Sequence, residues 1–192
     1  KILNKLNSAI EFENFVHKKF VGQKRFSVEG GESIIPCLDY LLDMCMDEKI
    51  KDVVIGMAHR GRLNVLSNIL GKDYEDIFNE LKGKDFEGDL FDGDVIYHLG
   101  FSNSIKNKNH RMVVNLCPNP SHLESVGPVV QGICRSKIDK DKMNYDKTLP
   151  VIIHGDAALA GQGVCYETIQ MSQLKGYKTG GTIHLVINNQ LG

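Results

Sequence analysis

The 192-residue sequence has no long hydrophobic run and no excess of charge of either sign. No apolar stretch reaches the roughly 18 residues that a membrane-spanning helix needs, so no segment is predicted to cross a bilayer. Lys and Arg together number 23 and Asp and Glu 24, which gives a formal net charge of −1. This balance provides no electrostatic footprint for nucleic acid or for an anionic membrane. Any binding of phosphate must therefore be local.

The cysteine spacing also matches no common disulfide or zinc-binding pattern. The five cysteines are odd in number and form no C-x-x-C pair: Cys37, Cys45, Cys117, Cys134 and Cys165. Neither a disulfide framework nor a zinc site is expected from this spacing. Each cysteine is interpreted as a small buried hydrophobe. A reducing compartment fits best, either the cytoplasm or the mitochondrial matrix.

The chain also lacks an initiator methionine and a signal-peptide pattern at its start, Lys1-Ile-Leu-Asn-Lys5. These absences indicate a fragment of a longer protein. The length fits a single domain with a sizeable core. We therefore expect one α/β domain over residues 1–192, with residues 1–47 as a helical lead-in.

The hydrophobic pattern alternates between helix-like and strand-like segments. Helices are predicted over residues 8–20, 34–47, 63–70, 73–83 and from a Ser121–Glu124 capping box through Ile133. Strands are predicted over residues 52–57, 95–98, 111–117, 149–154 and 182–187. Residues 83–93, 103–110 and 136–147 are expected to be a charged loop, a polar surface segment and a lysine-rich linker. The alternation favours a doubly wound α/β fold, with a mainly parallel sheet and helices on both faces.

Two polar sites follow two of the predicted strands. Asp156 comes just after the strand 149–154, and the pair Asn188-Asn189 comes just after the strand 182–187. In a βαβ unit the two strands are parallel neighbours, so their carboxyl ends meet at the edge where open α/β sheets bind ligands. A carboxylate and an amide oxygen suit Mg²⁺, which completes its shell with water and phosphate oxygens. The segment predicts a site for Mg²⁺ and a phosphorylated cofactor.

Gly161 and Gly163 lie between the two strands, where a helix is expected to begin. They would allow backbone N–H groups to approach phosphate oxygens, with support from the helix dipole. The alternative interpretation is purely structural: Asp156 caps a helix and the asparagines belong to a turn.

The pattern resembles the thiamine diphosphate motif, in which Gly-Asp-Gly is followed about 30 residues later by Asn-Asn. Ala157 replaces the second glycine, a variant expected in the E1 components of 2-oxoglutarate dehydrogenase. Five blocks in order are similar to that family: Lys24-Arg-Phe-Ser-Val-Glu-Gly-Gly-Glu32, Gly56-Met-Ala-His-Arg-Gly-Arg-Leu-Asn-Val65, Tyr97-His-Leu-Gly-Phe-Ser102, Asn119-Pro-Ser-His-Leu-Glu124 and Ile153-His-Gly-Asp-Ala-Ala-Leu-Ala-Gly-Gln-Gly163. The resemblance covers about residues 12–192 and implies a truncated thiamine diphosphate-binding fold.

The resemblance implies roles for individual residues. Asp156 and Asn189 would be side-chain ligands of Mg²⁺, and Leu191 would contribute a backbone carbonyl. Ala157 and Ser102 would lie by the diphosphate.

Two histidines, His59 and His98, would face the 2-oxo acid by the same resemblance. The residues themselves fit that role, because each histidine follows a predicted strand and can donate a hydrogen bond to a carboxylate or ketone oxygen.

The implied reaction is oxidative decarboxylation of 2-oxoglutarate, a step of the citric acid cycle. Thiamine diphosphate acts as electron sink, and the succinyl group passes to a lipoyl group on an E2 partner. The family's activating glutamate has no match in this chain, which stops at Gly192, so we expect no turnover by these residues alone. The family also implies a homodimer. Two alternatives stay open: an E1 acting on 2-oxoadipate, and a non-catalytic module that binds Mg²⁺ and a nucleotide or diphosphate.

The remaining histidines and two arginines carry weaker signals. His154 lies within a predicted strand and His122 near a predicted cap, so each has a structural and a functional interpretation. His17, His110 and His184 are expected to be structural or solvated. Arg60 and Arg62 could attract anions or form surface salt bridges.

Overall fold

The computed structural model describes residues 1–82, 98–188 and 190. The chain divides into two compact units, which are described separately. The first unit comprises Lys1–Met44 and His59–Leu99, and the second comprises Cys45–Ala58 and Gly100–Gly192. Among the described residues, no helix combines the length and the apolar character needed to span a membrane.

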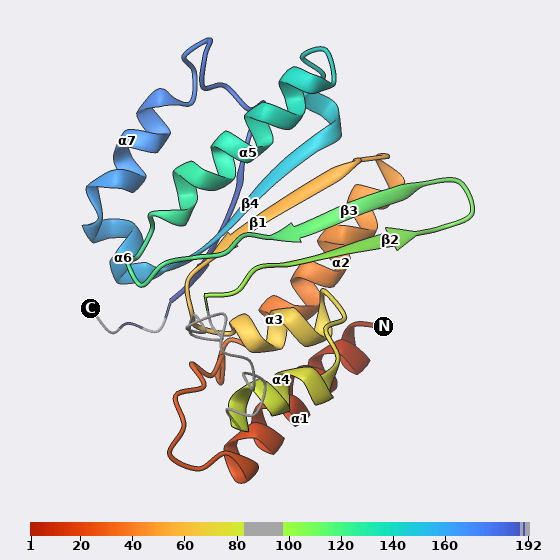
Figure 1. Cartoon of the computed structure of the whole chain (residues 1–192), viewed down its shortest axis with the longest axis vertical. Helices are drawn as coiled ribbons and strands as arrows, with labels where there is room; N and C mark the ends of the chain where they lie inside the picture. Colours follow the sequence, from red (N-terminus) through yellow and green to blue (C-terminus); the bar gives the residue numbers. More distant parts are fainter. Residues whose placement is uncertain (83–97, 189, 191–192) are drawn as a thin grey trace, which may run out of the picture. The chain divides into compact units, whose positions relative to one another are not determined.

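The second unit is built on a five-stranded sheet with the order β2-β3-β1-β4-β5 (Figure 1). Its strands are β1 (Asp52–Met57), β2 (Phe101–Lys106), β3 (Arg111–Leu116), β4 (Thr148–Gly155) and β5 (Ile183–Ile187). β1 pairs in parallel with β3 and β4, and β4 pairs in parallel with β5. The only antiparallel pairing among the described strands joins β2 to β3. The prediction of a mainly parallel α/β sheet is confirmed.

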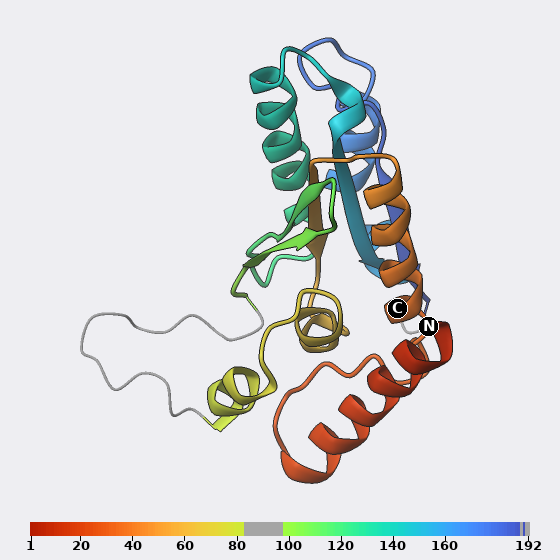
Figure 2. The ribbon, with the colours of Figure 1, turned by 90° about the vertical axis from the view of Figure 1, so that its right-hand side faces the viewer.

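Helix α5 (Val126–Lys140) packs along one face of this sheet (Figure 2). Val130 and Cys134 of α5 form a buried cluster with Val54 of β1 and Ile152 of β4. Gly56 permits this approach, because a Cβ atom there would lie 2.6 Å from a methyl carbon of Val130. The opposite face of the central strands is equally buried, at Val53, Ile55, Val151 and Ile153. Both faces of β1 and β4 are therefore covered, as long runs of apolar residues in parallel strands predict.

The predicted βαβ unit is present in the second half of the chain. β4 and β5 are parallel neighbours, and Gly155 pairs with Ile187 at their carboxyl ends. Two short helices, α6 (Asp156–Gly161) and α7 (Gly163–Met171), lie between the strands. Gly163 does begin a helix, whereas Gly161 ends the preceding one, and Gln162 between them has an extended backbone.

The first unit contains α1 (Ile2–Lys19), most of α2 (Ile34–Asp47), α3 (Arg62–Asn68) and α4 (Tyr74–Lys82). Stacked and tilted aromatic rings join α1 to α4, at Phe12, Phe15, Tyr74 and Phe78. α2 has the predicted bounds, and α3 and α4 have nearly the predicted ones. The prediction for α1 was wrong at its start: the helix begins at Ile2, six residues earlier than residue 8, and its first turn carries the largely exposed Ile2 and Leu3.

Residues 103–110, predicted to be a polar surface segment, are mostly exposed, but the prediction missed a strand over their first half. Phe101–Lys106 forms β2, which is joined to β3 by a turn in which the Asn107 side chain accepts hydrogen bonds from the N–H groups of Asn109 and His110. β2 lies at the sheet edge, and half of its residues are exposed. Polar side chains therefore destabilise the strand little at this edge. Because of them, the segment lacks the hydrophobic pattern by which a strand is predicted.

Two further predictions around α5 were wrong. The helix begins at Val126, and Glu124 has a left-handed backbone with φ of 69°, so Ser121 and Glu124 form no capping box. The predicted linker over residues 136–147 is instead the end of α5 and the short 3₁₀ helix η1 (Tyr145–Lys147). Ile138 continues the buried stripe of Val130 and Cys134 at intervals of four, which keeps the lysine-rich segment helical.

The predicted loop at 83–93 and the first three residues of the strand predicted at 95–98 lie outside the described residues. His98, the last residue of that predicted strand, lies in a turn.

Candidate functional site

Asp156 lies at the carboxyl end of β4, as the first residue of α6. Its Oδ2 accepts a hydrogen bond of 3.2 Å from the backbone N–H of Gln190, in the segment that follows β5. The same N–H donates to Oδ1 of Asn188 at 3.1 Å. The structure thus brings the aspartate and the segment after β5 together, as the parallel pairing of β4 and β5 predicted.

The residues at this edge fit a hard divalent cation. The Asp156 carboxylate and the Asn188 amide oxygen converge on one backbone N–H, and Asp156 is only half-buried. A half-buried carboxylate with a neighbouring amide oxygen is the oxygen-only donor set that Mg²⁺ prefers, with positions left for water or phosphate oxygens. Two of the predicted ligands, Asn189 and Leu191, lie outside the described residues.

The two residues predicted to lie by a diphosphate occupy different parts of the same sheet. Ala157 is exposed in the first turn of α6, next to Asp156. Ser102 lies at the start of β2, where the neighbouring Phe101 pairs with Leu116 at the carboxyl end of β3. Its hydroxyl is hydrogen-bonded to the side chain of Asn115. Ser102 therefore shares the carboxyl-end edge with Asp156, but β3 and β1 lie between their strands.

The two predicted substrate-facing histidines lie together in the first unit. The ring centroids of His59 and His98 are 5.3 Å apart, with the planes tilted by 39°. The Phe26 ring stacks on His59 at 4.9 Å. Burial lowers the pKa of His59, and the nearby charges of His98 and Arg62 lower it further. A neutral imidazole at His59 can donate one hydrogen bond and accept another, or take up a proton.

A tight turn holds His59 in place. Gly61 has a left-handed φ of 74°, and a Cβ atom there would lie 2.9 Å from Cβ of Val28. Its N–H donates to the carbonyl oxygen of Phe26 at 2.8 Å. Arg60 donates from Nη1 to the carbonyl oxygen of Ser27 at 3.0 Å. The segment 26–28 and the turn after β1, which belong to two of the similar blocks, are thus in contact.

Arg62 is fully buried, with no exposed surface, so a role in surface salt bridging is excluded for this residue. Its Nη2 donates to the carbonyl oxygen of Leu99 at 2.7 Å, which ties the chain beside His98 to α3. The buried guanidinium contributes the positive charge that helps to keep His59 neutral.

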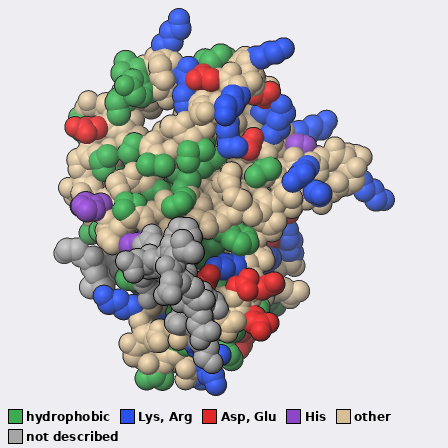
Figure 3. Space-filling model, viewed as in Figure 1, with side chains coloured by type: hydrophobic (Ala, Val, Ile, Leu, Met, Phe, Trp, Pro, Cys, Tyr) green, Lys and Arg blue, Asp and Glu red, His purple; other side chains and the backbone are tan. Residues whose placement is uncertain are grey.

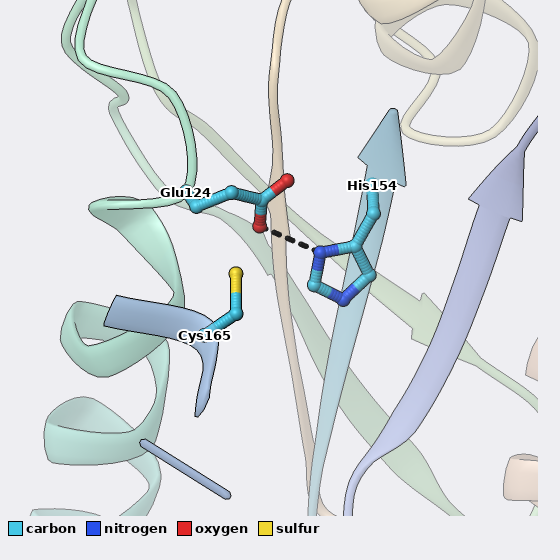
Figure 4. A group of neighbouring side chains, drawn as sticks. All are labelled: Glu124, His154 and Cys165. Carbon is cyan, nitrogen blue, oxygen red and sulfur yellow. Dashed lines mark hydrogen bonds and ion pairs between the residues drawn. The ribbon is translucent and has the colours of Figure 1, made fainter. Parts of the chain in front are cut away.

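The sequence did not predict a polar cluster that is formed by residues of β4, of α7 and of the turn before α5 (Figure 4). Glu124 Oε2 and His154 Nδ1 are 2.6 Å apart, and both side chains are buried. His154 Nε2 lies 2.8 Å from Nδ1 of His184, whose ring stacks on that of His154. The Cys165 thiol of α7 completes the group, with its sulfur within 4.8 Å of the Glu124 and His154 ligand atoms. The His154 imidazole is therefore buried and has a hydrogen-bond partner at each ring nitrogen.

The surroundings shift two pKa values in this cluster. Burial raises the pKa of Cys165 to about 12, with further contributions from the charge of Glu124 and a hydrogen bond to it. Burial, followed by the charge of His154, lowers the pKa of His184. Parallel pairing offered one signal for the cluster: His184 pairs with Ile152, so His154, two residues on, lies on the same face. No sequence signal placed Glu124 there.

Comparison with known proteins gives a consistent result. The family model for the dehydrogenase E1 component matches residues 4–192. The whole chain is 50% identical to part of the 2-oxoglutarate dehydrogenase E1 component of Cupriavidus necator, of which it covers 20%. It is also 50% identical to part of the multifunctional 2-oxoglutarate metabolism enzyme of Mycolicibacterium vanbaalenii, covering 16%. For the E1 component of a Geobacillus species the identity is 48% and the coverage 22%.

The chain thus spans 16–22% of the length of these curated relatives. The family match, in contrast, extends over nearly every residue of the chain, including β4, α6 and the segment after β5. The chain belongs to the dehydrogenase E1 component family.

Proposed function

We propose that this chain is the Mg²⁺- and diphosphate-binding part of a 2-oxoglutarate dehydrogenase E1 component. The observation that carries the proposal is Asp156 at the carboxyl end of β4, hydrogen-bonded to the segment after β5. The dehydrogenase E1 family uses thiamine diphosphate and Mg²⁺, and the similar relatives are described as 2-oxoglutarate enzymes. The proposed overall reaction is oxidative decarboxylation of 2-oxoglutarate in the citric acid cycle.

The proposed cofactor ligands lie in the segments after β4 and β5. Asp156 and Asn189 bind Mg²⁺ through side-chain oxygens, and Leu191 contributes its backbone carbonyl. Ala157 and Ser102 lie by the diphosphate. Thiamine diphosphate, when bound, supplies a carbon nucleophile and an electron sink for decarboxylation.

His59 and His98 are proposed to bind the 2-oxo acid. Their rings are close enough for both to reach one small anion, since the centroids are 5.3 Å apart. A neutral His59, favoured by its lowered pKa, donates a hydrogen bond to the ketone or carboxylate oxygen. Phe26 and the Gly61 turn hold the His59 ring in place, so the ring loses little conformational entropy when substrate binds.

Partners follow from the same proposal. The succinyl group passes to a lipoyl group on an E2 acyltransferase, and the full-length chain forms a homodimer. A relative from Corynebacterium glutamicum is described as a 2-oxoglutarate dehydrogenase E1/E2 component, a description that names E1 and E2 together for one protein.

The metal assignment is tested by calorimetry on the complete gene product. Thiamine diphosphate is titrated with and without Mg²⁺, using the native protein, Asp156→Asn and the control Asp146→Asn, an exposed aspartate in η1. We expect Mg²⁺-dependent binding in the native protein and the control, and at least tenfold weaker binding in Asp156→Asn. Binding that is independent of both Mg²⁺ and Asp156 contradicts the assignment.

Activity is tested separately, by release of CO₂ from 2-oxoglutarate. The full-length protein is expected to release CO₂, and to prefer 2-oxoglutarate to 2-oxoadipate. The 192 residues alone are expected to have no turnover, because they represent 22% or less of the length of the relatives compared above. Turnover by these residues alone would overturn that expectation.

A further inference from the structure

We propose that Glu124, His154 and Cys165 form a second cation site, selective for a soft divalent ion such as Zn²⁺. The three residues come from separate elements of the second unit: the turn before α5, strand β4 and helix α7. The proposed site is thus assembled through space, which explains why cysteine spacing gave no indication of zinc.

The ligand atoms lie close to the arrangement that a tetrahedral ion requires. The Glu124 carboxylate, a His154 ring nitrogen and the Cys165 sulfur all lie within 4.8 Å of one another. Bond lengths of about 2.0–2.3 Å place the ligands of tetrahedral zinc roughly 3.3–3.7 Å apart. The 2.6 Å separation of Glu124 and His154 must therefore open by about 1 Å, within the reach of a glutamate rotamer adjustment.

A small cavity provides an independent indication of a ligand. It has a volume of about 20 Å³ and is lined by Glu124, His154, Cys165 and His184 together with apolar side chains, among them Ile152 and Leu159. About 10–15 Å³ is enough for one water molecule. The space thus suits a single ion or water molecule.

Charge balance favours occupation of this cavity by a divalent ion. Glu124, His154 and Cys165 are each more than nine-tenths buried. When the ion binds, the Cys165 sulfur forms a bond to the metal and its proton leaves to solvent. One carboxylate and one thiolate then neutralise a charge of +2, so the buried group has a net charge of zero.

His184 is placed to orient the histidine ligand. His154 Nδ1 faces Glu124 and the cavity, while Nε2 lies 2.8 Å from Nδ1 of His184. With a metal on Nδ1, the hydrogen of the neutral ring resides on Nε2 and is donated to His184. Such an outer partner fixes the tautomer and the ring orientation of a metal-bound histidine.

The ligand chemistry separates this site from the one proposed at Asp156. A thiolate and an imidazole favour zinc or cobalt, whereas Mg²⁺ requires oxygen ligands. The two proposals can consequently fail independently of each other.

The test is a Co²⁺ titration of the full-length protein, followed by the thiolate-to-cobalt charge-transfer absorption in the near ultraviolet. We expect one equivalent of this absorption per chain, lost on addition of one equivalent of Zn²⁺ and unaffected by excess Mg²⁺. Cys165→Ser should abolish it, and Cys37→Ser, which alters an exposed cysteine, should leave it unchanged.

A second variant keeps the test decisive if Cys165→Ser fails to fold. His184→Gln retains all three ligands and should weaken Co²⁺ binding by roughly 10- to 100-fold without removing the absorption. Absence of the absorption in the native protein overturns the proposal, as does equal absorption in folded Cys165→Ser. Mg²⁺-dependent binding of thiamine diphosphate by the same samples reports on the Asp156 site separately.

Discussion

Gly61 is constrained by its backbone angle, by a hydrogen bond and by close packing. It has a positive φ, its N–H donates to Phe26, and no space exists beside it for a side chain. Because it lies two residues after His59, its backbone conformation sets the direction in which the turn presents that ring.

Gly61→Ala should destabilise the first unit. The left-handed backbone costs an alanine about 1–2 kcal/mol, and contact with Val28 raises the expected total to about 2–3 kcal/mol. Gly22→Ala is the matched control: φ is 81° there, but no atom of the described residues lies within 4 Å of the added carbon. Urea denaturation should give a clearly larger loss for Gly61→Ala, and equal losses would show that the Val28 contact has no energetic effect.

His59 should make stability depend on pH. Its folded-state pKa is lowered from 6.5, so between that value and the folded pKa the unfolded chain binds the proton more readily. Stability is therefore full above pH 6.5 and falls as the pH drops below it. His59→Gln should flatten this part of the profile in thermal unfolding between pH 7.5 and pH 5, taken as an approximate working range around the histidine pKa. A profile unchanged by the substitution would exclude His59 as the cause.

At the scale of elements, the packing of α3 on α1 depends on a buried amide. Asn64 donates from Nδ2 to the carbonyl oxygen of Ala9 and to Glu13 Oε1, both at 3.0 Å. Its Oδ1 accepts a hydrogen bond of 2.7 Å from Asn68. Since Asn64 and Glu13 are both buried, the amide satisfies a carboxylate that has lost most of its water.

Asn64→Leu should therefore cost roughly 2–5 kcal/mol, because it leaves Glu13 without its amide donor in a buried position. Ser67→Ala serves as control, since the Ser67 hydroxyl donates within α3, to the carbonyl oxygens of Leu63 and Asn64, and its loss should cost about 0.5 kcal/mol. The comparison is made by urea denaturation. Equal losses in the two variants would contradict the role assigned to Asn64.

The same scale explains what the sequence could predict. β1, β4 and β5 were predictable because apolar runs bounded by polar turns have few alternatives, and their pairing placed Asp156 beside the segment after β5. β2 was not predictable by hydrophobicity, since an edge strand tolerates polar residues such as Ser102 and Asn103. At Glu124 a local pattern predicted a helix cap, but the buried imidazole of His154, 30 residues away, binds the carboxylate instead. A partner so distant in the sequence cannot be predicted from the spacing of neighbouring residues.

At the scale of the whole molecule, apolar side chains reach the surface around α7 and β5. Figure 3 shows hydrophobic side chains on the surface over the α5 and α7 region. Large exposed apolar residues there include Val129, Tyr166, Ile169, Tyr177 and Val186. β5 is also an edge strand, and the net charge of −1 offers little repulsion between copies.

We expect the 192 residues, produced alone, to self-associate at micromolar concentration. Val186→Lys places a charge on the exposed face of β5 and should shift the chain towards monomer in light scattering coupled to size-exclusion chromatography. Val21→Lys is the control, because Val21 is even more exposed but lies in a loop of the first unit. Equal effects of the two lysines would attribute the change to net charge alone.

The strand order also determines the order in which backbone hydrogen bonds of the sheet open to solvent. β1 is hydrogen-bonded on both sides, to β3 and to β4, and it is buried along nearly its whole length. Its amide protons can exchange with solvent only when the centre of the sheet opens, whereas the outer side of β5 is unpaired among the described residues. Deuterium should therefore enter the sheet from its edge strands, β2 and β5, and reach β1 last. The turn that presents His59 begins directly after this slowest strand, so it is attached to the part of the backbone that opens least often.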